Sequence, residues 1–309
     1  MRNALIRGLT ALAERDDSVA LLTGDLGFKI FDDFARRFPG RFINAGVAEA
    51  NMVGVAAGMA MDGLRPFAYS ITPFATLRCL EQIRNDVCYH NLPVTIVGVG
   101  GGFAYGPNGP THHALEDIAV MRTLPNLTVV CPGDPVEAEL AVLQIGDQAG
   151  PVYLRLGRAG DPVVHQHPPE FRIGSAITLQ PGSDCVLIST GGILSVAMEA
   201  AGLLRAVSVE ARVISMHTVK PLDSATLAQC CNQNVPVFTV EEHSQAGGLG
   251  SAIGEWLCEH HVSCRLNLIA AGDHFAHRSG SQNFLRAREG LTAAQVAHRV
   301  TSVLEAAAC

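Results

Sequence analysis

The first half of the chain alternates short apolar segments with helical patterns, and this alternation constrains the fold more than any other feature. Strands that alternate with helices predict a parallel sheet covered by helices on both faces. The segment 94–99 is almost entirely apolar, as a central parallel strand should be. Strands are expected at 19–23, 41–44, 66–70, 94–99, 127–131 and 152–156, and helices at 3–15, 31–38, 48–61, 74–90, 115–124 and 135–146.

A linker and a second α/β pattern follow. The segment 157–170 contains three prolines and shows no periodicity, which is typical of a connection between domains. Beyond it, strands are expected at 185–189, 211–215, 237–240 and 265–268, with helices between them. We therefore predict two three-layer α/β/α domains, residues 1–160 and 173–309, joined by a linker at 161–172.

Composition excludes several classes of function. Apolar residues make up 48% of the chain and charged residues 17%, and the net charge of -7 argues against a nucleic-acid-binding surface. The apolar run at 53–61 is too short to cross a membrane, and the N-terminus lacks a signal peptide. None of the nine cysteines, Cys309 included, forms a C-x-x-C pair, so we expect reduced thiols in a cytoplasmic protein.

Glu49 is the single acid in a run of small and apolar residues, INAGVAEANMVGVAAGMAM, at 43–61. A buried carboxylate is costly unless it is paired or held neutral. Gly54 and Gly58 in the same run have the spacing that lets another backbone approach closely, although helix–sheet packing would explain them equally well. The run by itself leaves two interpretations of Glu49, a catalytic carboxyl or a surface charge at a helix N-terminus.

A second unusual stretch, GGGFAYGPNGPTHH at 100–113, follows a predicted strand and precedes a predicted helix. It therefore lies at the carboxyl end of the sheet, where open α/β folds bind ligands. Its glycines and prolines fix an unusual backbone shape, and His112 and His113 close it. No carboxylate or cysteine is spaced to complete a metal site with this pair. The stretch is either a functional loop or a structural loop that ends in a capping histidine.

Three segments in order resemble one family: GVAEANMVGVAAG around Glu49, YSITPFATLRCLEQIRNDV at 69–87 and GPNGPTHHALEDIAVMRTLPN at 106–126. They are similar to the C-terminal portion of transketolase, and the resemblance continues through EEHSQAGGLGSAIGEWL at 241–257. It is nearest to the C-terminal subunits of split transketolases. It implies that residues 1–160 form a pyrimidine-binding domain and that residues 173–309 form the smaller transketolase C-terminal domain.

The resemblance answers the question that Glu49 raises. In this family a glutamate at the Glu49 position hydrogen-bonds the aminopyrimidine ring of thiamine diphosphate and activates the cofactor. Phe74 corresponds to an aromatic residue that stacks on that ring, and Ile71 stands where transketolases have another aromatic residue of the pocket. An apolar pocket with one carboxyl is what this chemistry requires, so the burial of Glu49 would be part of the catalysis.

The same resemblance implies a set of substrate-binding residues. His112 corresponds to a histidine that contacts substrate oxygens, Arg155 to an arginine that binds a substrate phosphate, and Arg78 to an arginine of deoxyxylulose-phosphate synthases. Asn108 stands where an acid reads a donor hydroxyl; an amide carries no charge and can donate. Gly100 replaces a second histidine and leaves space. These differences predict a specificity that departs from that of ordinary transketolases.

The chain lacks one part that the family requires. Thiamine diphosphate is bound through Mg²⁺ by a G-D-G motif followed by an asparagine, and no G-D-G occurs in this sequence. The resemblance therefore implies half of an active site, with no metal ligand in this chain. The Mg²⁺ and diphosphate ligands are expected on a separate N-terminal transketolase subunit, in a heterotetramer with two copies of each chain (α₂β₂).

The implied activity is that of a transferase, which moves a two-carbon ketol unit between ketose and aldose sugars or sugar phosphates. Two related enzymes remain as alternatives: the β subunit of the first component of a 2-oxoacid dehydrogenase, and a specialised acyloin-forming or deoxyxylulose-phosphate-synthase-like enzyme. The G-P-T-H and A-L-E-D-I-A segments favour the transketolase. A non-catalytic regulatory subunit is the alternative of another class, and the presence of Glu49, Phe74 and His112 together argues against it.

Overall fold

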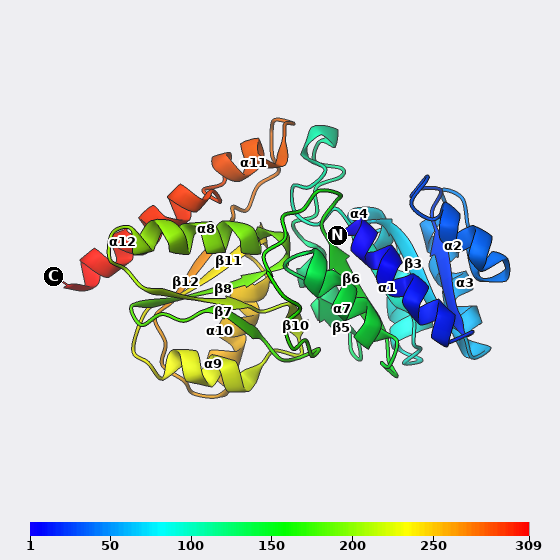
Figure 1. Ribbon diagram of the computed structural model, residues 1–309, viewed down its shortest axis with the longest axis horizontal. Helices are drawn as coiled ribbons and strands as arrows, with labels where there is room; N and C mark the ends of the chain where they lie inside the picture. Colours follow the sequence, from blue (N-terminus) through cyan, green and yellow to red (C-terminus); the bar gives the residue numbers. More distant parts are fainter. Residues whose placement is uncertain (309) are drawn as a thin grey trace.

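The computed structural model describes residues 1–308, which form two sheets, each with helices on both faces (Figure 1). The first sheet has the strand order β10-β5-β6-β4-β3-β1-β2 and the second the order β12-β11-β8-β9-β7. The strands of the first sheet are β1 (Val19–Thr23), β2 (Phe42–Asn44), β3 (Arg65–Ile71), β4 (Thr95–Val99), β5 (Thr128–Val130), β6 (Val152–Leu156) and β10 (Thr218–Lys220). Those of the second are β7 (Ile177–Gln180), β8 (Cys185–Thr190), β9 (Ala211–Ser215), β11 (Val237–Ser244) and β12 (Leu266–Ala271).

The helices lie between the strands along the chain, as the alternation predicts. The first part of the chain contains α1 (Arg2–Arg15), α2 (Asp32–Arg37), η1 (Pro39–Arg41), α3 (Glu49–Met61), α4 (Thr72–Ala75), α5 (Leu80–Gln82), the π-helix η2 (Ile83–Cys88), η3 (Gly106–Asn108), α6 (Asp117–Arg122) and α7 (Pro135–Ile145). The second part contains η4 (Gly191–Ile193), α8 (Leu194–Arg205), α9 (Ser224–Cys231), α10 (Leu249–Glu259), α11 (Gln282–Arg288) and α12 (Ala293–Ala308).

The two-domain α/β architecture is confirmed, with two edge strands outside the predicted pattern. β10 pairs antiparallel with β5, and β7 pairs antiparallel with β9. Both strands are short and lie at the edge of a sheet, so they are less buried than a central parallel strand and lack its continuous apolar run. Because β10 comes from the second half of the chain, it joins that half to the first sheet.

The hydrophobic core also crosses between the two halves. On one face of the first sheet, α1 and α7 pack together over β1 and β6 (Figure 1). On the other face, a single cluster runs from Met52 and Ile96 in the first half to Val186 and Trp256 in the second. A third cluster fills the space between the second sheet and α8 and α12. The continuous core holds the two domains against each other over a shared apolar surface.

The segment expected as one helix at 74–90 is instead broken into α4, α5 and the π-helix η2. The apolar periodicity of the segment predicts which side faces the sheet, but not whether the helix is continuous. Arg78 lies in the break between α4 and α5, and from there its side chain turns back toward the N-terminus of α3. The break in the helix therefore accompanies the contact between Arg78 and Glu49.

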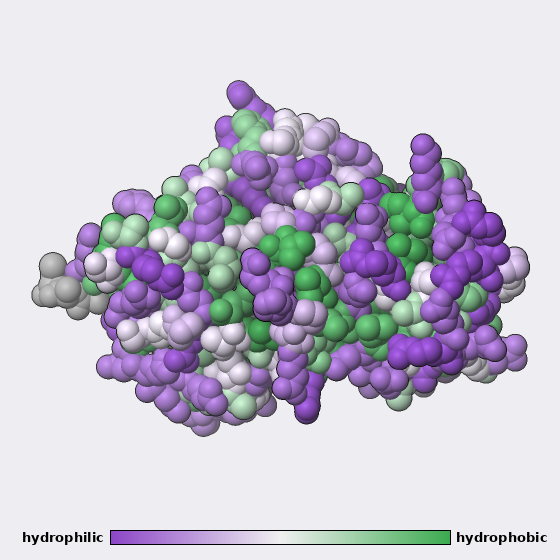
Figure 2. All heavy atoms as spheres, in the orientation of Figure 1, coloured by the Kyte–Doolittle hydropathy of each residue, from purple (hydrophilic) through white to green (hydrophobic). Residues whose placement is uncertain are grey.

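The face shown in Figure 2 is mostly hydrophilic, with apolar residues reaching the surface mainly along the middle of the molecule. The strongly exposed apolar side chains include Phe28, Val47, Met61, Tyr89 and Phe275. Within residues 1–308, no helix is both long and apolar enough to cross a membrane.

Candidate functional site

Glu49 begins α3, and its side chain is only 2% exposed. Ser70, near the end of β3, donates its hydroxyl to Glu49 Oε1 at 3.1 Å, and Arg78 Nη1 donates to Oε2 at 2.8 Å. Gly24, the residue after β1, lies so close to this carboxyl that a Cβ there would stand 3.3 Å from Glu49 Cγ. The adjacent parallel strands β1 and β3 therefore end around this carboxylate. A carboxylate has about four acceptor positions, so this one can accept a further donor.

Phe74 and His112 lie beside one another near this carboxylate. Phe74 lies on α4, and its ring meets the His112 ring edge-on, with the centroids 5.1 Å apart. Thr111 Oγ1 lies 3.0 Å from His112 Nδ1, whereas Nε2 has no partner among the described residues. The structure thus brings together, at the carboxyl edge of the first sheet, three residues that lie far apart in the sequence.

Arg78 connects Glu49 to Phe74. Its guanidinium pairs with the Glu49 carboxylate, and its Cζ lies 4.4 Å from the centroid of the Phe74 ring. A planar group that donates N–H bonds to Glu49 and covers Phe74 therefore fits between these two residues. The aminopyrimidine of thiamine diphosphate is likewise planar, and in the place of the guanidinium one of its ring nitrogens could share a proton with Glu49. The Arg78 side chain is 48% exposed, so it has room to turn outward.

The loop at 100–113 is closed at its base, because Gly102 and Ala114 exchange two backbone hydrogen bonds of 2.9 Å. Gly100 adopts a φ of +90°, and a Cβ there would stand 2.2 Å from the Tyr105 ring. The space expected beside Gly100 is therefore filled by Tyr105. Asn108 lies exposed in η3. Ile71 is partly buried at the end of β3 and packs against the core cluster on the α1 side.

The two histidines of the loop differ in their surroundings. His113 is 6% exposed, its Nε2 lies 3.3 Å from the carbonyl oxygen of Gly106, and its ring packs edge-on against Phe103. His112 is only partly buried and faces Phe74. His113 therefore has a structural role inside the loop, whereas His112 remains available to a ligand.

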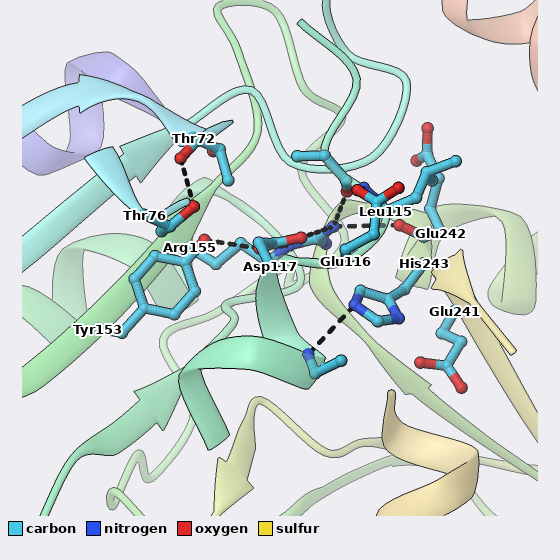
Figure 3. A network of polar contacts seen from close by, with 12 residues as sticks. Thr72, Thr76, Leu115, Glu116, Asp117, Tyr153, Arg155, Glu241, Glu242 and His243 are labelled. Atoms are coloured by element: carbon cyan, nitrogen blue, oxygen red, sulfur yellow. Dashed lines mark hydrogen bonds and ion pairs between the residues drawn. The ribbon is translucent and has the colours of Figure 1, made fainter. Parts of the chain in front are cut away.

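Arg155 is not placed as the sequence predicts. Its side chain is 4% exposed, and Nε donates to Asp117 Oδ2 at 2.7 Å (Figure 3). Nη2 donates to the carbonyl oxygens of Ala114 at 2.9 Å and Glu242 at 3.1 Å. Desolvation lowers the pKa of Arg155, but the Asp117 carboxylate outweighs this and raises it above its ordinary value. The expected contact with a substrate phosphate does not fit a guanidinium that is directed into the protein interior.

The same network reaches His243 on β11 (Figure 3). His243 Nε2 accepts from the backbone N–H of Ala119 at 3.3 Å, and Nδ1 donates to the carbonyl oxygen of Ser244 at 2.8 Å. Because Nε2 accepts a hydrogen bond, it carries no proton, and the ring is neutral. Burial penalises the charged form and lowers the pKa of His243 to about 4.

A pH-dependent loss of stability follows from His243. Because its pKa is lower in the folded chain than the ordinary 6.5, its contribution is present above pH 6.5 and is lost as the pH falls toward 4. His243→Gln keeps an acceptor but cannot be protonated. The free energy of unfolding of the wild type, relative to this variant, should fall by about 2 kcal/mol between about pH 7 and pH 5. Urea unfolding at the two pH values measures it, and a constant difference would contradict the neutral assignment.

Metal-binding and thiol chemistry receive no support from the arrangement of side chains. Over the part of the chain that the structure describes, no three His, Cys, Asp or Glu side chains gather to hold a metal ion. The eight described cysteines are free thiols, and most are buried. Burial raises the pKa of Cys79, close to Glu49, to about 12, so this thiol is not a nucleophile at neutral pH. Cys309 lies outside the described residues.

Sequence reasoning missed several residues around the site. Ser70 was not predicted to contact Glu49, and neither Asp117 nor Glu242 was predicted to surround Arg155. The sequence offers one usable signal: Asp117 and Glu242 are each the second of two adjacent acids that border an apolar run. Ser70 offers none, because a serine at the end of a strand is common.

Two family profiles match the chain. "Transketolase, pyrimidine binding domain" matches residues 1–160, and "Transketolase, C-terminal domain" matches residues 174–296. Among solved structures, "Split gene transketolase, inactive beta4 tetramer" has a TM-score of 0.91 and 37% sequence identity, and the match covers 98% of each chain.

Two curated transketolase subunits match over nearly their whole length. A subunit of the apulose-4-phosphate transketolase of Phocaeicola vulgatus is 38% identical over 89% of this chain and 92% of its own. The 6-deoxy-6-sulfo-D-fructose transketolase subunit SqwH of Clostridium sp. (strain MSTE9) is 37% identical over 97% and 94%. By contrast, 1-deoxy-D-xylulose-5-phosphate synthase of Syntrophotalea carbinolica is 33% identical over 96% of this chain but only 47% of its own.

Proposed function

Since the chain belongs to the transketolase family, we propose that it is the C-terminal subunit of a split, thiamine-diphosphate-dependent transketolase, a transferase that moves a two-carbon ketol unit from a ketose to an aldose. The convergence of Glu49, Phe74 and His112 at one edge of the first sheet is the observation that carries this proposal. Relatives that match along their whole length are transketolase subunits, whereas the deoxyxylulose-phosphate synthase is about twice as long. This favours ketol transfer over the synthase alternative.

One group of residues in this chain would contact the cofactor, and His112 would contact the substrate. Thiamine diphosphate, when bound, supplies the carbon that takes up the ketol unit from the donor sugar and passes it to the acceptor sugar. Glu49 would share a proton with a ring nitrogen of the aminopyrimidine, while Phe74 covers the face of that ring and Ile71 closes the pocket edge. Arg78 turns outward to make room. His112 Nε2 would bind substrate oxygens.

The substrate is proposed to be a ketose with an anionic end group. Two relatives act, by name, on a phosphorylated and on a sulfonated sugar. With Arg155 committed to Asp117, the half-exposed Arg78 is the cation that remains close to Phe74 and His112. Arg78 would then bind the substrate anion once it leaves Glu49, and Asn108 on the exposed loop would contact a hydroxyl.

A partner subunit is proposed to cover the outward face of α3. This helix is apolar nearly all round, yet Val55 and Met61 are exposed, and a Cβ on Gly54 or Gly58 would meet nothing within 4 Å. α3 lies at the end of the molecule far from the C-terminus (Figure 1). A chain docked here would lie next to Glu49. We propose that it is the N-terminal transketolase subunit, which supplies Mg²⁺ and diphosphate ligands, and that two copies of each chain assemble.

Gly58→Gln should separate assembly from folding. The new side chain has open space in the lone subunit and replaces a helix glycine, so stability should rise by about 0.5–1 kcal/mol. The same side chain should block a closely packed partner and weaken complex formation by tenfold or more, about 1.4 kcal/mol. Urea unfolding and a titration with the partner measure the two effects. Gly202→Gln, at an exposed glycine within α8 that also has open surroundings, is the matched control: it should raise stability similarly and leave assembly unchanged. Unchanged assembly of Gly58→Gln would place the partner elsewhere.

The proposed function is tested by purification of the tagged chain from its host and assay of what co-purifies. We expect a second chain that carries G-D-G and a following asparagine, and ketol transfer from a phosphorylated or sulfonated ketose once thiamine diphosphate and Mg²⁺ are added. If no such chain co-purified, and the isolated chain bound the cofactor tightly by itself, the assignment of half a site would be overturned.

A further inference from the structure

The second domain holds both ends of the loop at 100–113. Near the start of the loop, the backbone N–H of Phe103 donates to Glu242 Oε1 on β11 at 2.8 Å. Just after its end, Arg155 Nη2 donates both to the carbonyl oxygen of Ala114 and to the backbone carbonyl oxygen of Glu242 (Figure 3). One residue of the second domain is therefore tied to both ends of a loop that belongs to the first.

Glu242 is itself fixed by α11. Its side chain is 4% exposed; Arg286 Nε donates to Oε2 at 3.0 Å, with a further bond from Nη2, and Gln282 Nε2 lies 3.1 Å from each carboxylate oxygen. The loop packs directly on this carboxylate, because a Cβ on Gly102 would stand 2.6 Å from Glu242 Cδ. Only a glycine permits that approach. Of the hydrogen bonds to the carboxylate, the one from Phe103 alone comes from the first domain within the described residues.

The segment that leads into α11 touches the middle of the loop as well. Gly280 N donates to the carbonyl oxygen of Gly106 at 3.4 Å, and a Cβ on Gly109 would stand 3.2 Å from Ser279 Oγ. Leu285 shares a buried cluster with Phe103. α11 and the loop accordingly lie side by side in Figure 1. The loop is held at its ends and its middle by the same part of the second domain.

We propose that Glu242 is a positioning residue for ketol transfer, which fixes the loop so that His112 stays against Phe74 and faces the substrate. The catalytic consequence of this inference rests on the proposed function, whereas the contact between Glu242 and the loop is independent of it. It gives the second domain a role in the reaction, although that domain contributes no side chain to the group formed by Glu49, Phe74 and His112.

Glu242→Gln breaks this contact selectively. The charged Arg286 will keep the remaining oxygen of the amide, so the amide NH₂ group will face the N–H of Phe103, and two donors cannot bond. In the full chain, hydrogen–deuterium exchange of the 100–113 peptide should rise about tenfold. In the assembled complex, kcat/KM should fall about tenfold or more, with unchanged affinity for thiamine diphosphate.

Two further variants complete the test. Gln282→Leu removes a donor to Glu242 but leaves the bond to Phe103, so loop exchange and kcat/KM should stay near wild type. Gly102→Ala pushes the loop off the carboxylate while the Arg286 pair stays intact, and it should reproduce Glu242→Gln if the latter folds poorly. Unchanged loop exchange in both Glu242→Gln and Gly102→Ala would overturn the proposal, as would normal turnover with a mobile loop. A wild-type complex without ketol transfer would instead refute the proposed function, while the exchange result would still decide the contact.

Discussion

Glu49→Gln is expected to remove nearly all ketol transfer by the assembled complex, by a factor of about 10² to 10⁴, the usual contribution of a positioned acid–base group. The amide has the size of the carboxyl, its oxygen can still accept from Arg78, and its NH₂ group can donate to the Ser70 hydroxyl, so the pocket should keep its shape. It cannot share a proton with the aminopyrimidine ring, which is the role proposed for Glu49. Initial rates with saturating cofactor, measured beside the cofactor dissociation constant, separate a loss of catalysis from a loss of binding.

Ser70→Ala is the matched control for this variant. It removes one hydrogen bond to Glu49 Oε1 but leaves the carboxyl and its partner Arg78 in place. Because the carboxyl that shares the proton remains, Ser70→Ala should lower the rate by about tenfold at most, less than the 10² to 10⁴ expected for Glu49→Gln. If Glu49→Gln retained more than about a tenth of the wild-type rate, Glu49 would not be the group that activates the cofactor.

The central strands of the first sheet were predictable because burial on both faces leaves a direct mark on the sequence. All five residues of β1 and of β6 are buried, and both strands have the bounds expected from the sequence, 19–23 and 152–156. The prediction of one continuous helix at 74–90 was wrong, because the break depends on a contact with a distant residue and leaves no mark on the local sequence. Arg78 pairs with a carboxylate 29 residues earlier, and this long-range bond accompanies the break in the helix.

The candidate site was predictable in its residue types more than in its contacts. Glu49 stands out as an acid in an apolar run, and the glycines around His112 mark a loop at a strand end. Arg155 shows the limit of such reasoning. An arginine on the last strand of the first domain suggests an anion site, but its partner Asp117 is 38 residues away and lies inside the protein. Only the fold shows that the charge is already neutralised.

The buried pair of Arg155 and Asp117 should dominate the stability of this region. Asp117→Ala would leave Arg155, which is 4% exposed, as an uncompensated charge in the interior and would remove the acceptor of the Tyr153 hydroxyl. Loss of one partner of a buried ion pair typically costs about 3–5 kcal/mol. We expect a decrease of this size in the free energy of unfolding, measured by urea denaturation of the full chain with its slope compared to that of the wild type.

Glu255→Ala provides the comparison, because Arg122 and Glu255 form the other ion pair that begins on α6. Glu255 is 65% exposed, so its removal leaves a cation that water can solvate, and the cost should stay within about 1 kcal/mol. A similar loss in both variants would mean that Arg155 gains water when Asp117 is removed. Arg155 would then lie within reach of water, as a contact with a substrate phosphate requires. A large loss confined to Asp117→Ala would instead show that Arg155 serves the fold and the loop that it ties to the second domain.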